Sequence, residues 1–164
     1  MLIIVRIGKL GKEEISKNYF NIMAKTRIAL IQMKMSSDQK KNMGSAIKKI
    51  KEACKKKAKI ICLPELFLTN YFCQTESHSN FKLAEKIPGK ISGIFCDLAK
   101  ELGVVLNITK FEKKTSGFYH NTSIISNENG NILSKYRKMH IPDDPGYYEK
   151  FYFSPGDLGF KSVK

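Results

Sequence analysis

Residues 28–63 read IALIQMKMSSDQKKNMGSAIKKIKEACKKKAKIICL, and this stretch decides the fold. Strand-like apolar runs stand at both ends, at 28–32 and 60–63. The segment between them opens with Ser36, Ser37 and Asp38, which are residue types favoured at a helix N-cap. Apolar side chains then recur at helical spacing, at Met43, Ala46, Ile47, Ile50, Ala53 and Cys54. A strand, a helix and a second strand within about 40 residues are typical of a crossover unit that joins two parallel strands.

The rest of the chain adds a second helix and an antiparallel pair of strands. We expect a helix over 92–102, ended by Gly103, and a strand over 104–108. Strands over 118–126 and 132–136 are joined through Asn129-Gly130, a strong hairpin signal. The sequence therefore predicts an α/β domain with a mixed sheet and two helices on one face. Residues 160–164 resemble the start of a further strand, which would leave an unpaired sheet edge.

Residues 1–24 are predicted to be an extension of the domain, because they show no convincing hydrophobic period. Met23 is an alternative start to Met1, and residues 25–164 form one predicted domain. Within this domain, residues 69–90 form a long loop whose aromatic residues indicate ordered packing. Loops of this length inside a compact domain are usually either functional or disordered.

Composition argues against several classes of partner. The formal net charge is +14, but the lysines are spread along the chain and no basic stretch alternates with aromatic residues. We therefore expect neither a nucleic-acid nor a membrane partner, and no segment is long enough to cross a bilayer. The four cysteines form no C-x-x-C pair and no metal-ligand spacing with the three histidines. This pattern predicts a cytoplasmic protein without a metal or cofactor.

Glu65 is the first candidate for chemistry. It follows the apolar run 60–63 and Pro64, and three further apolar residues come after it. A carboxylate among apolar neighbours is costly unless it is paired, and burial raises the pKa of such an acid, which suits a general base. The alternative is an acid at a strand end that points into water.

Lys138 is the second candidate, in the segment 135–142 at the exit of the second hairpin strand. Because side chains alternate along a strand, Lys138 shares a face with Tyr136 and His140, and Arg137 points to the opposite face. A lysine held beside a carboxylate can stabilise an oxyanion. The alternative is a solvated basic strand end, since exposed lysine is common.

Glu149 is the third candidate. It stands among aromatic residues in the segment 145–160, ahead of the turn Pro155-Gly156-Asp157. In one interpretation Glu149 pairs with a nearby lysine. In the other it only solubilises an aromatic strand.

Taken together, these segments resemble the nitrilase superfamily of carbon–nitrogen hydrolases, from about Thr26 to the last residue. The motifs are Leu63-Pro64-Glu65, Tyr136-Arg137-Lys138 with His140, and Glu149-Lys150 with residues 153–157. Residues 135–160, 65–67 and 71–74 are most similar to the N-carbamoylputrescine amidases and related N-carbamoyl-amine hydrolases. The resemblance implies an αββα sandwich, a small N-carbamoyl amine or amide substrate, and a homo-oligomer for the full-length members.

The resemblance also implies a Glu-Lys-Cys mechanism. Glu65 matches the general base, Lys138 matches the residue that stabilises the tetrahedral intermediate, and Glu149 matches a second acid that orients the substrate and supports the lysine. In such enzymes a cysteine attacks the amide or carbamoyl carbon, ammonia leaves, and water hydrolyses the acyl-enzyme.

The nucleophile is the one part of the mechanism that this sequence does not supply. The family's cysteine lies downstream of the Pro-Gly-Asp turn, whereas all four cysteines here precede Lys138. Cys62 is nearest to Glu65 in sequence, but its position in an apolar strand favours a buried structural thiol. We therefore expect an incomplete αββα sandwich that is inactive by itself. The alternative function is a catalytically dead interaction module that pairs with a full-length homologue, since an open sheet invites strand addition.

Overall fold

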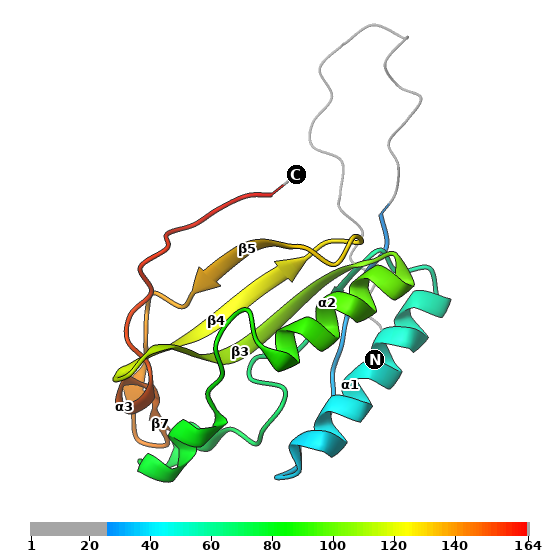
Figure 1. Cartoon of the computed structure of the whole chain (residues 1–164). Helices are drawn as coiled ribbons and strands as arrows, with labels where there is room; N and C mark the ends of the chain where they lie inside the picture. The colour runs from blue at the N-terminus through cyan, green and yellow to red at the C-terminus, as the bar shows by residue number, and fades with distance from the viewer. Residues whose placement is uncertain (1–25, 164) are drawn as a thin grey trace, which may run out of the picture.

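A mixed five-stranded sheet is the centre of the fold (Figure 1). The structure is a computed structural model that describes residues 26–163. The strands lie in the order β1 (Ile28–Leu30), β2 (Ile60–Cys62), β3 (Val105–Thr115), β4 (Phe118–Ser126) and β5 (Ile132–Arg137). β1, β2 and β3 are parallel, and β3, β4 and β5 are antiparallel. The predicted extension 1–24 lies outside the described residues.

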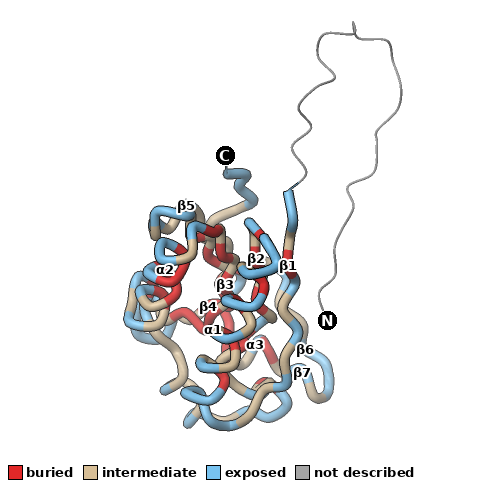
Figure 2. Tube along the Cα trace, turned by 90° about the vertical axis from the view of Figure 1, so that its right-hand side faces the viewer, coloured by how far each residue is buried: buried red, intermediate tan, exposed pale blue. Residues whose placement is uncertain are grey.

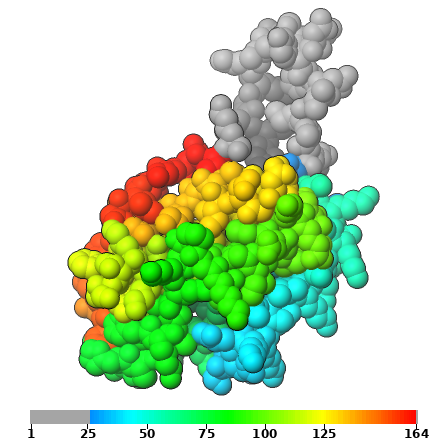
Figure 3. Space-filling view, in the orientation of Figure 1, coloured from blue at the N-terminus to red at the C-terminus, as the bar shows by residue number. Residues whose placement is uncertain are grey.

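Two helices cover one face of the sheet, as predicted: α1 (Gln39–Lys55) and α2 (Lys90–Leu102). Both face the viewer in Figure 1, and Figure 3 shows the same face filled. Asp38 caps α1, because its carboxylate accepts hydrogen bonds from the main-chain N–H groups of Lys40 and Lys41. α2 ends at Gly103, whose φ of 60° is a left-handed conformation that glycine adopts without strain.

The main core lies between these helices and the sheet, where the buried positions gather in Figure 2. Its strand residues follow the sheet register: Ala29 of β1 pairs with Ile61 of β2, and Ile61 with Leu106 of β3. From the helices come Ala46, Ile50, Phe95, Leu98 and Ala99. Because alternate strand residues point to opposite faces, this register assigns the neighbouring residues of each strand to the side without helices.

A second, mainly aromatic cluster closes one end of the sheet. It combines Phe111 of β3 with Phe72 of η1 (Phe72–Gln74), Phe81 of η2 (His78–Leu83) and Tyr152 of α3 (Glu149–Tyr152). The Tyr152 hydroxyl donates to the Thr75 carbonyl at 2.6 Å and accepts from the Ser77 N–H at 2.9 Å. The segment 69–90 is therefore an ordered part of the fold, as its aromatic residues predict.

Three sequence predictions need correction. β3 continues to Thr115 instead of ending near 108, because its polar second half pairs with β4 around a turn at Gly117, where φ is 78°. Residues 160–163 form no strand, and Phe160 is exposed and stacks on Tyr136 with a ring distance of 5.5 Å. The segment around Glu149 is a short helix, not an aromatic strand; a small hairpin of β6 (Asp143–Asp144) and β7 (Tyr147–Tyr148) precedes it.

Candidate active site

The three acid and lysine candidates meet at the end of the sheet. Lys138 Nζ lies 3.1 Å from Glu65 Oε1 and 2.8 Å from Glu149 Oε2. These side chains come from segments separated by 73 and 11 residues along the chain. The Lys138 ammonium lies between the two carboxylates, so each charge of this cluster has an oppositely charged neighbour. Partly buried charges need such neighbours to offset the hydration that they lose.

Glu65 stands in the turn that follows β2, and this turn is fixed by β3. The Thr109 hydroxyl accepts from the Leu66 N–H at 2.9 Å and donates to the Pro64 carbonyl at 2.8 Å. Leu66 adopts a φ of 49°, a region that residues other than glycine seldom occupy. Tertiary contacts, more than local preference, therefore set the main chain around Glu65.

The surroundings of Glu65 differ from the sequence expectation. Its side chain is 53% exposed, so the burial expected from its apolar neighbours is absent. Those neighbours, Leu63, Leu66 and Phe67, are themselves buried, but they point away into the two apolar clusters. Glu65 is held instead by polar contacts, with Lys138 at 3.1 Å and the side-chain amide of Asn121 at 2.5 Å from the same oxygen, Oε1.

Lys138 directly follows β5, and its peptide groups are hydrogen-bonded on both sides. Its N–H donates to the Asn121 carbonyl at 2.8 Å, and its carbonyl accepts from the Gly156 N–H at 2.9 Å. Burial by itself lowers the pKa of Lys138, but hydrogen bonds to Glu149 and Glu65 outweigh it and raise the pKa above the ordinary lysine value. The lysine therefore stays a cation across the neutral range, as a group that stabilises an oxyanion must.

Glu149 is the buried member of the cluster, with 3% of its surface exposed at the start of α3. The Tyr71 hydroxyl donates to Glu149 Oε1 at 2.9 Å, and Lys138 contacts both carboxylate oxygens. Burial raises the pKa of Tyr71, and the hydrogen bond to Glu149 raises it further. Tyr71 is thus a hydrogen-bond donor to an anion, and Glu149 is oriented by two groups, not merely solvated at the surface.

Behind Lys138, on the opposite face of β5, lies an ion network in which Arg137 and Glu112 are buried and Asp157 is exposed. Arg137 donates from Nε and Nη2 to the two oxygens of Glu112 at 2.7 and 2.8 Å, and from Nη1 to Asp157 at 2.7 Å. The Thr122 hydroxyl donates to Glu112 at 2.6 Å. Gly156 packs against this strand so closely that a Cβ there would lie 2.0 Å from the Arg137 carbonyl oxygen. The network ties residues 155–157, where the structure has an irregular segment and not the turn expected from the sequence, to the strand end that carries Lys138.

The charged cluster affects the pKa of the Cys73 thiol. It is fully buried, and burial together with the negative charge of Glu149 raises its pKa to about 12. A thiol with so high a pKa is a poor nucleophile, because the thiolate is the reactive form. Cys62 is half-buried on β2, and burial raises its pKa as well.

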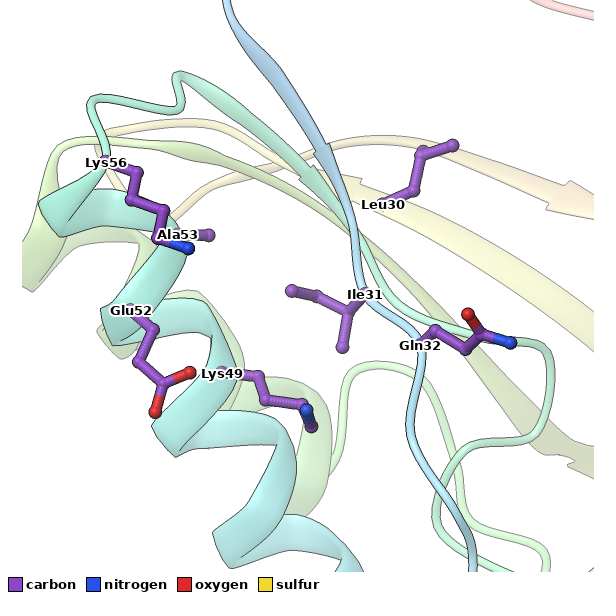
Figure 4. A pocket seen from close by; sticks show the side chains of 7 residues that line it. All are labelled: Leu30, Ile31, Gln32, Lys49, Glu52, Ala53 and Lys56. Atoms are coloured by element: carbon purple, nitrogen blue, oxygen red, sulfur yellow. The ribbon is translucent and has the colours of Figure 1, made fainter. Parts of the chain in front are cut away.

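Two hollows lie near these elements. The larger, of about 570 Å³, contains none of the three candidate residues and is lined by residues that follow Lys138 and Glu149 in the sequence: Met139, His140, Ile141, Lys150, Phe153, Ser154 and Pro155. The smaller, of about 80 Å³, lies between α1 and the chain that leaves β1 and contains no candidate residue (Figure 4).

Within residues 26–163 no group of three or more His, Cys, Asp or Glu side chains is arranged to hold a metal ion. None of the helices in this part of the chain is long and apolar enough to cross a membrane.

Sequence reasoning missed Asn121 and the role of Tyr71. Asn121 lies in the middle of a predicted strand, where nothing in the local sequence marks it as functional. It contacts Glu65 only because β4 brings it beside a turn 56 residues earlier in the chain. Tyr71 belongs to the loop 69–90, whose aromatic residues predict packing only, whereas its hydroxyl contacts Glu149, 78 residues away.

Comparison with known proteins shows the family. The family model described as carbon-nitrogen hydrolase matches residues 27–164. The chain belongs to this family. The mixed sheet with helices on one face is the part of the carbon–nitrogen hydrolase fold that the described residues form.

Several relatives are similar to this chain in sequence over most of its length. An N-carbamoylputrescine amidase of Oryza sativa subsp. japonica is 42% identical over 86% of this chain and 47% of its own length. A citrullinase of Francisella tularensis subsp. tularensis is 38% identical over 85% of this chain and 49% of its own. The crystal structure of a carbon-nitrogen hydrolase from Helicobacter pylori G27 superimposes with a TM-score of 0.78 at 41% identity, covering 81% of this chain and 46% of that one. The chain thus spans about half the length of these relatives.

Proposed function

We propose that this chain provides the acid and lysine residues of an amidohydrolase that cleaves an N-carbamoyl amine. The proposed reaction converts N-carbamoylputrescine and water to putrescine, carbon dioxide and ammonia. The observation that carries the proposal is the contact of Lys138 with both Glu65 and Glu149, at 3.1 and 2.8 Å. A carboxylate that faces solvent can act as the general base for a thiol, and a cation beside it can stabilise the oxyanion that forms.

In this reaction Glu65 takes the proton of the attacking thiol and later activates water. The thiolate attacks the carbamoyl carbon, and Lys138 stabilises the negative oxygen of the tetrahedral intermediate. Ammonia leaves, and water releases the carbamate, which decomposes to the amine and carbon dioxide. Glu149 keeps Lys138 charged and in place, with Tyr71 fixing the carboxylate.

The substrate class rests on the relatives. N-carbamoylputrescine and citrulline both end in a ureido group, and the names of the Oryza and Francisella relatives refer to these two compounds. A ureido substrate presents a carbonyl flanked by two nitrogens, and an ammonium such as Lys138 suits the negative charge that develops on its oxygen.

The attacking sulfur is proposed to come from outside these 164 residues. No cysteine of the chain follows Lys138. Cys73, whose pKa is affected by the charge of Glu149, is buried and has a pKa of about 12. We therefore expect the isolated chain to release no ammonia from N-carbamoylputrescine above the level of its Glu65→Ala variant. Release that survives in Cys73→Ala but not in Glu65→Ala would mean that another cysteine of this chain is the nucleophile.

A chimera tests the proposed roles directly. Residues 26–163 would replace the matching half of the Oryza amidase, and ammonia release from N-carbamoylputrescine would be measured. We expect activity in the chimera, a loss of about 10²- to 10⁴-fold in Glu65→Gln and of about 10²- to 10³-fold in Lys138→Met. Lys100→Met, an exposed lysine of α2, is the matched control and should have no effect. Full activity of the Lys138→Met chimera would refute the assignment.

A catalytically dead interaction module remains the second proposal, and one observation favours it. In the described part of the chain both long helices cover the same sheet face, and on the other face Leu30 is 38% exposed beside half-buried Ile28, Ile60, Cys62 and Val105. Such a face is suited to a partner sheet. Sedimentation of the isolated chain distinguishes the cases, because a stable monomer at tens of micromolar would count against the module.

A further inference from the structure

Asn121 contacts two of the three candidate residues at once. It lies on β4 and is 4% exposed. Its side-chain amide donates to Glu65 Oε1 at 2.5 Å, and its main-chain carbonyl accepts from the Lys138 N–H at 2.8 Å. The main chain of Asn121 is fixed in turn by the sheet, where it pairs with Phe111 of β3. A single sheet residue therefore fixes both the carboxylate and the lysine.

The contacts of Glu65 are unequal between its two oxygens. Oε1 accepts both the Asn121 amide, at 2.5 Å, and Lys138 Nζ, at 3.1 Å. Within residues 26–163, Oε2 has no hydrogen-bond partner. An oxygen that already accepts two N–H groups is a weaker proton acceptor than one with free lone pairs, because each donor stabilises the charge on the oxygen it contacts.

We propose that Asn121 is a positioning residue that holds Glu65 Oε1 against Lys138 and leaves Oε2 as the oxygen that takes the proton of the nucleophile. This inference rests on the proposed function. The side chain of Glu65 is 53% exposed and would otherwise rotate freely in water. An amide restricts this rotation without adding a charge, whereas another lysine would compete with Lys138.

The orientation of the Asn121 amide follows from the same contact. A carboxylate only accepts hydrogen bonds, so the amide must present its NH₂ group, not its oxygen, to Glu65. Because Asn121 is buried, an amide without this partner would lose a hydrogen bond that water cannot easily replace. The pair is therefore mutually stabilising, and each side chain restricts the other.

The first test uses the unaltered chain. The side-chain amide signal of Asn121 is followed by ¹H–¹⁵N NMR as a function of pH, together with the ¹³C signal of the Glu65 carboxylate. We expect the two signals to move with one midpoint, and the amide movement to vanish in Glu65→Gln. An amide signal that ignores the titration of Glu65 would overturn the proposal.

The second test asks whether Asn121 acts on Lys138 through Glu65. The pKa of Lys138 is measured by ¹⁵N NMR of Nζ in the unaltered chain, Asn121→Leu, Glu65→Gln and the double variant. Each single substitution should lower the pKa of Lys138, because each removes Glu65 from its place beside the ammonium. The double variant should show no further fall relative to Glu65→Gln.

A purely structural role for Asn121 predicts a different pattern. In that case Asn121→Leu would lower the pKa of Lys138 equally with and without Glu65, and this result would refute the proposal. If Asn121→Leu does not fold, the first test still decides, since it requires no substitution at 121. Neither readout depends on turnover, so a failure of the chimera to release ammonia would count against the proposed function, whereas a failure of these two tests would count against the positioning role of Asn121.

Discussion

Replacing Arg137 by methionine should strongly destabilise the folded chain. The side chains of Arg137 and Glu112 are 6% and 3% exposed, and two hydrogen bonds of 2.7 and 2.8 Å join them. Arg137→Met keeps an unbranched apolar stem but removes the cation. Glu112 would then remain buried with only the Thr122 hydroxyl at 2.6 Å and Lys135 Nζ at 3.7 Å.

The expected cost is about 3 kcal/mol. Removing one partner of a buried ion pair typically costs about 3–5 kcal/mol, because the remaining charge loses its compensation. The lower end applies here, since Thr122 and Lys135 still contact Glu112. With a dependence of about 1–3 kcal/mol per molar urea, the midpoint of unfolding should fall by about 1–3 M. The matched control is Lys51→Met, whose exposed pair with Glu101 should contribute less than about 1 kcal/mol.

Urea unfolding followed by circular dichroism measures this effect, and pH provides a second check. Burial alone raises the pKa of Glu112, but hydrogen bonds from Arg137 and Thr122 hold it below the ordinary value of 4.5. The pair therefore contributes stability above that value and loses it as the pH falls through the lower folded-state pKa. In Arg137→Met the hydrogen bonds from Arg137 no longer offset the burial of Glu112, so protonation of Glu112 favours the folded state. The difference in the free energy of unfolding between the unaltered chain and Arg137→Met should therefore shrink in acid. A loss below about 1 kcal/mol at pH 7, or a difference that does not change with pH, would refute this reasoning.

Three further outcomes are expected. Gly156→Ala should lower the melting temperature, because its Cβ would lie 2.0 Å from the Arg137 carbonyl oxygen. The matched variant Gly44→Ala on α1 meets nothing within 4 Å and should stabilise the helix by about 0.5–1 kcal/mol. Equal melting temperatures for the two variants would contradict this expectation. Tyr71→Phe should cost about 1.5–3 kcal/mol in urea unfolding, since its hydroxyl donates to a buried carboxylate at 2.9 Å, and an unchanged midpoint would show that water replaces the bond. Cys73 should resist iodoacetamide at pH 8 in the folded chain, because its thiol is buried with a pKa of about 12; mass spectrometry should find it labelled only in urea, and fast labelling of the folded chain would disprove this.

Much of the fold follows from local patterns in the sequence. Asp38 and the apolar stripe 43–54 predict α1, and Gly130 predicts the hairpin between β4 and β5, where its φ is 81°. These features act over a few residues, because capping, helical periodicity and turn conformation depend on near neighbours. The ordered motifs around Glu65, Lys138 and Glu149 likewise indicate the family without any knowledge of the structure.

The errors arise where distant partners decide the outcome. The second half of β3 carries Lys110 and Glu112, which are residue types that usually lie on the surface. They are 3% and 2% exposed because Glu85 pairs with Lys110, and Arg137 with Glu112. Residues 160–164 resemble the start of a strand in the sequence, but among residues 26–163 no strand pairs with residues 160–163.

The sequence by itself determined the order of the two long helices and of the five strands of the sheet, and the family to which the motifs belong. Only the tertiary structure decided that Glu65 faces water beside Asn121, that Glu149 is buried against Tyr71, and that both carboxylates contact one ammonium. The physical reason is that hydrogen bonds and ion pairs between residues far apart in the chain depend on sheet register and on packing. A hydrophobic pattern records which face of a strand is buried, but not which polar group lies opposite it.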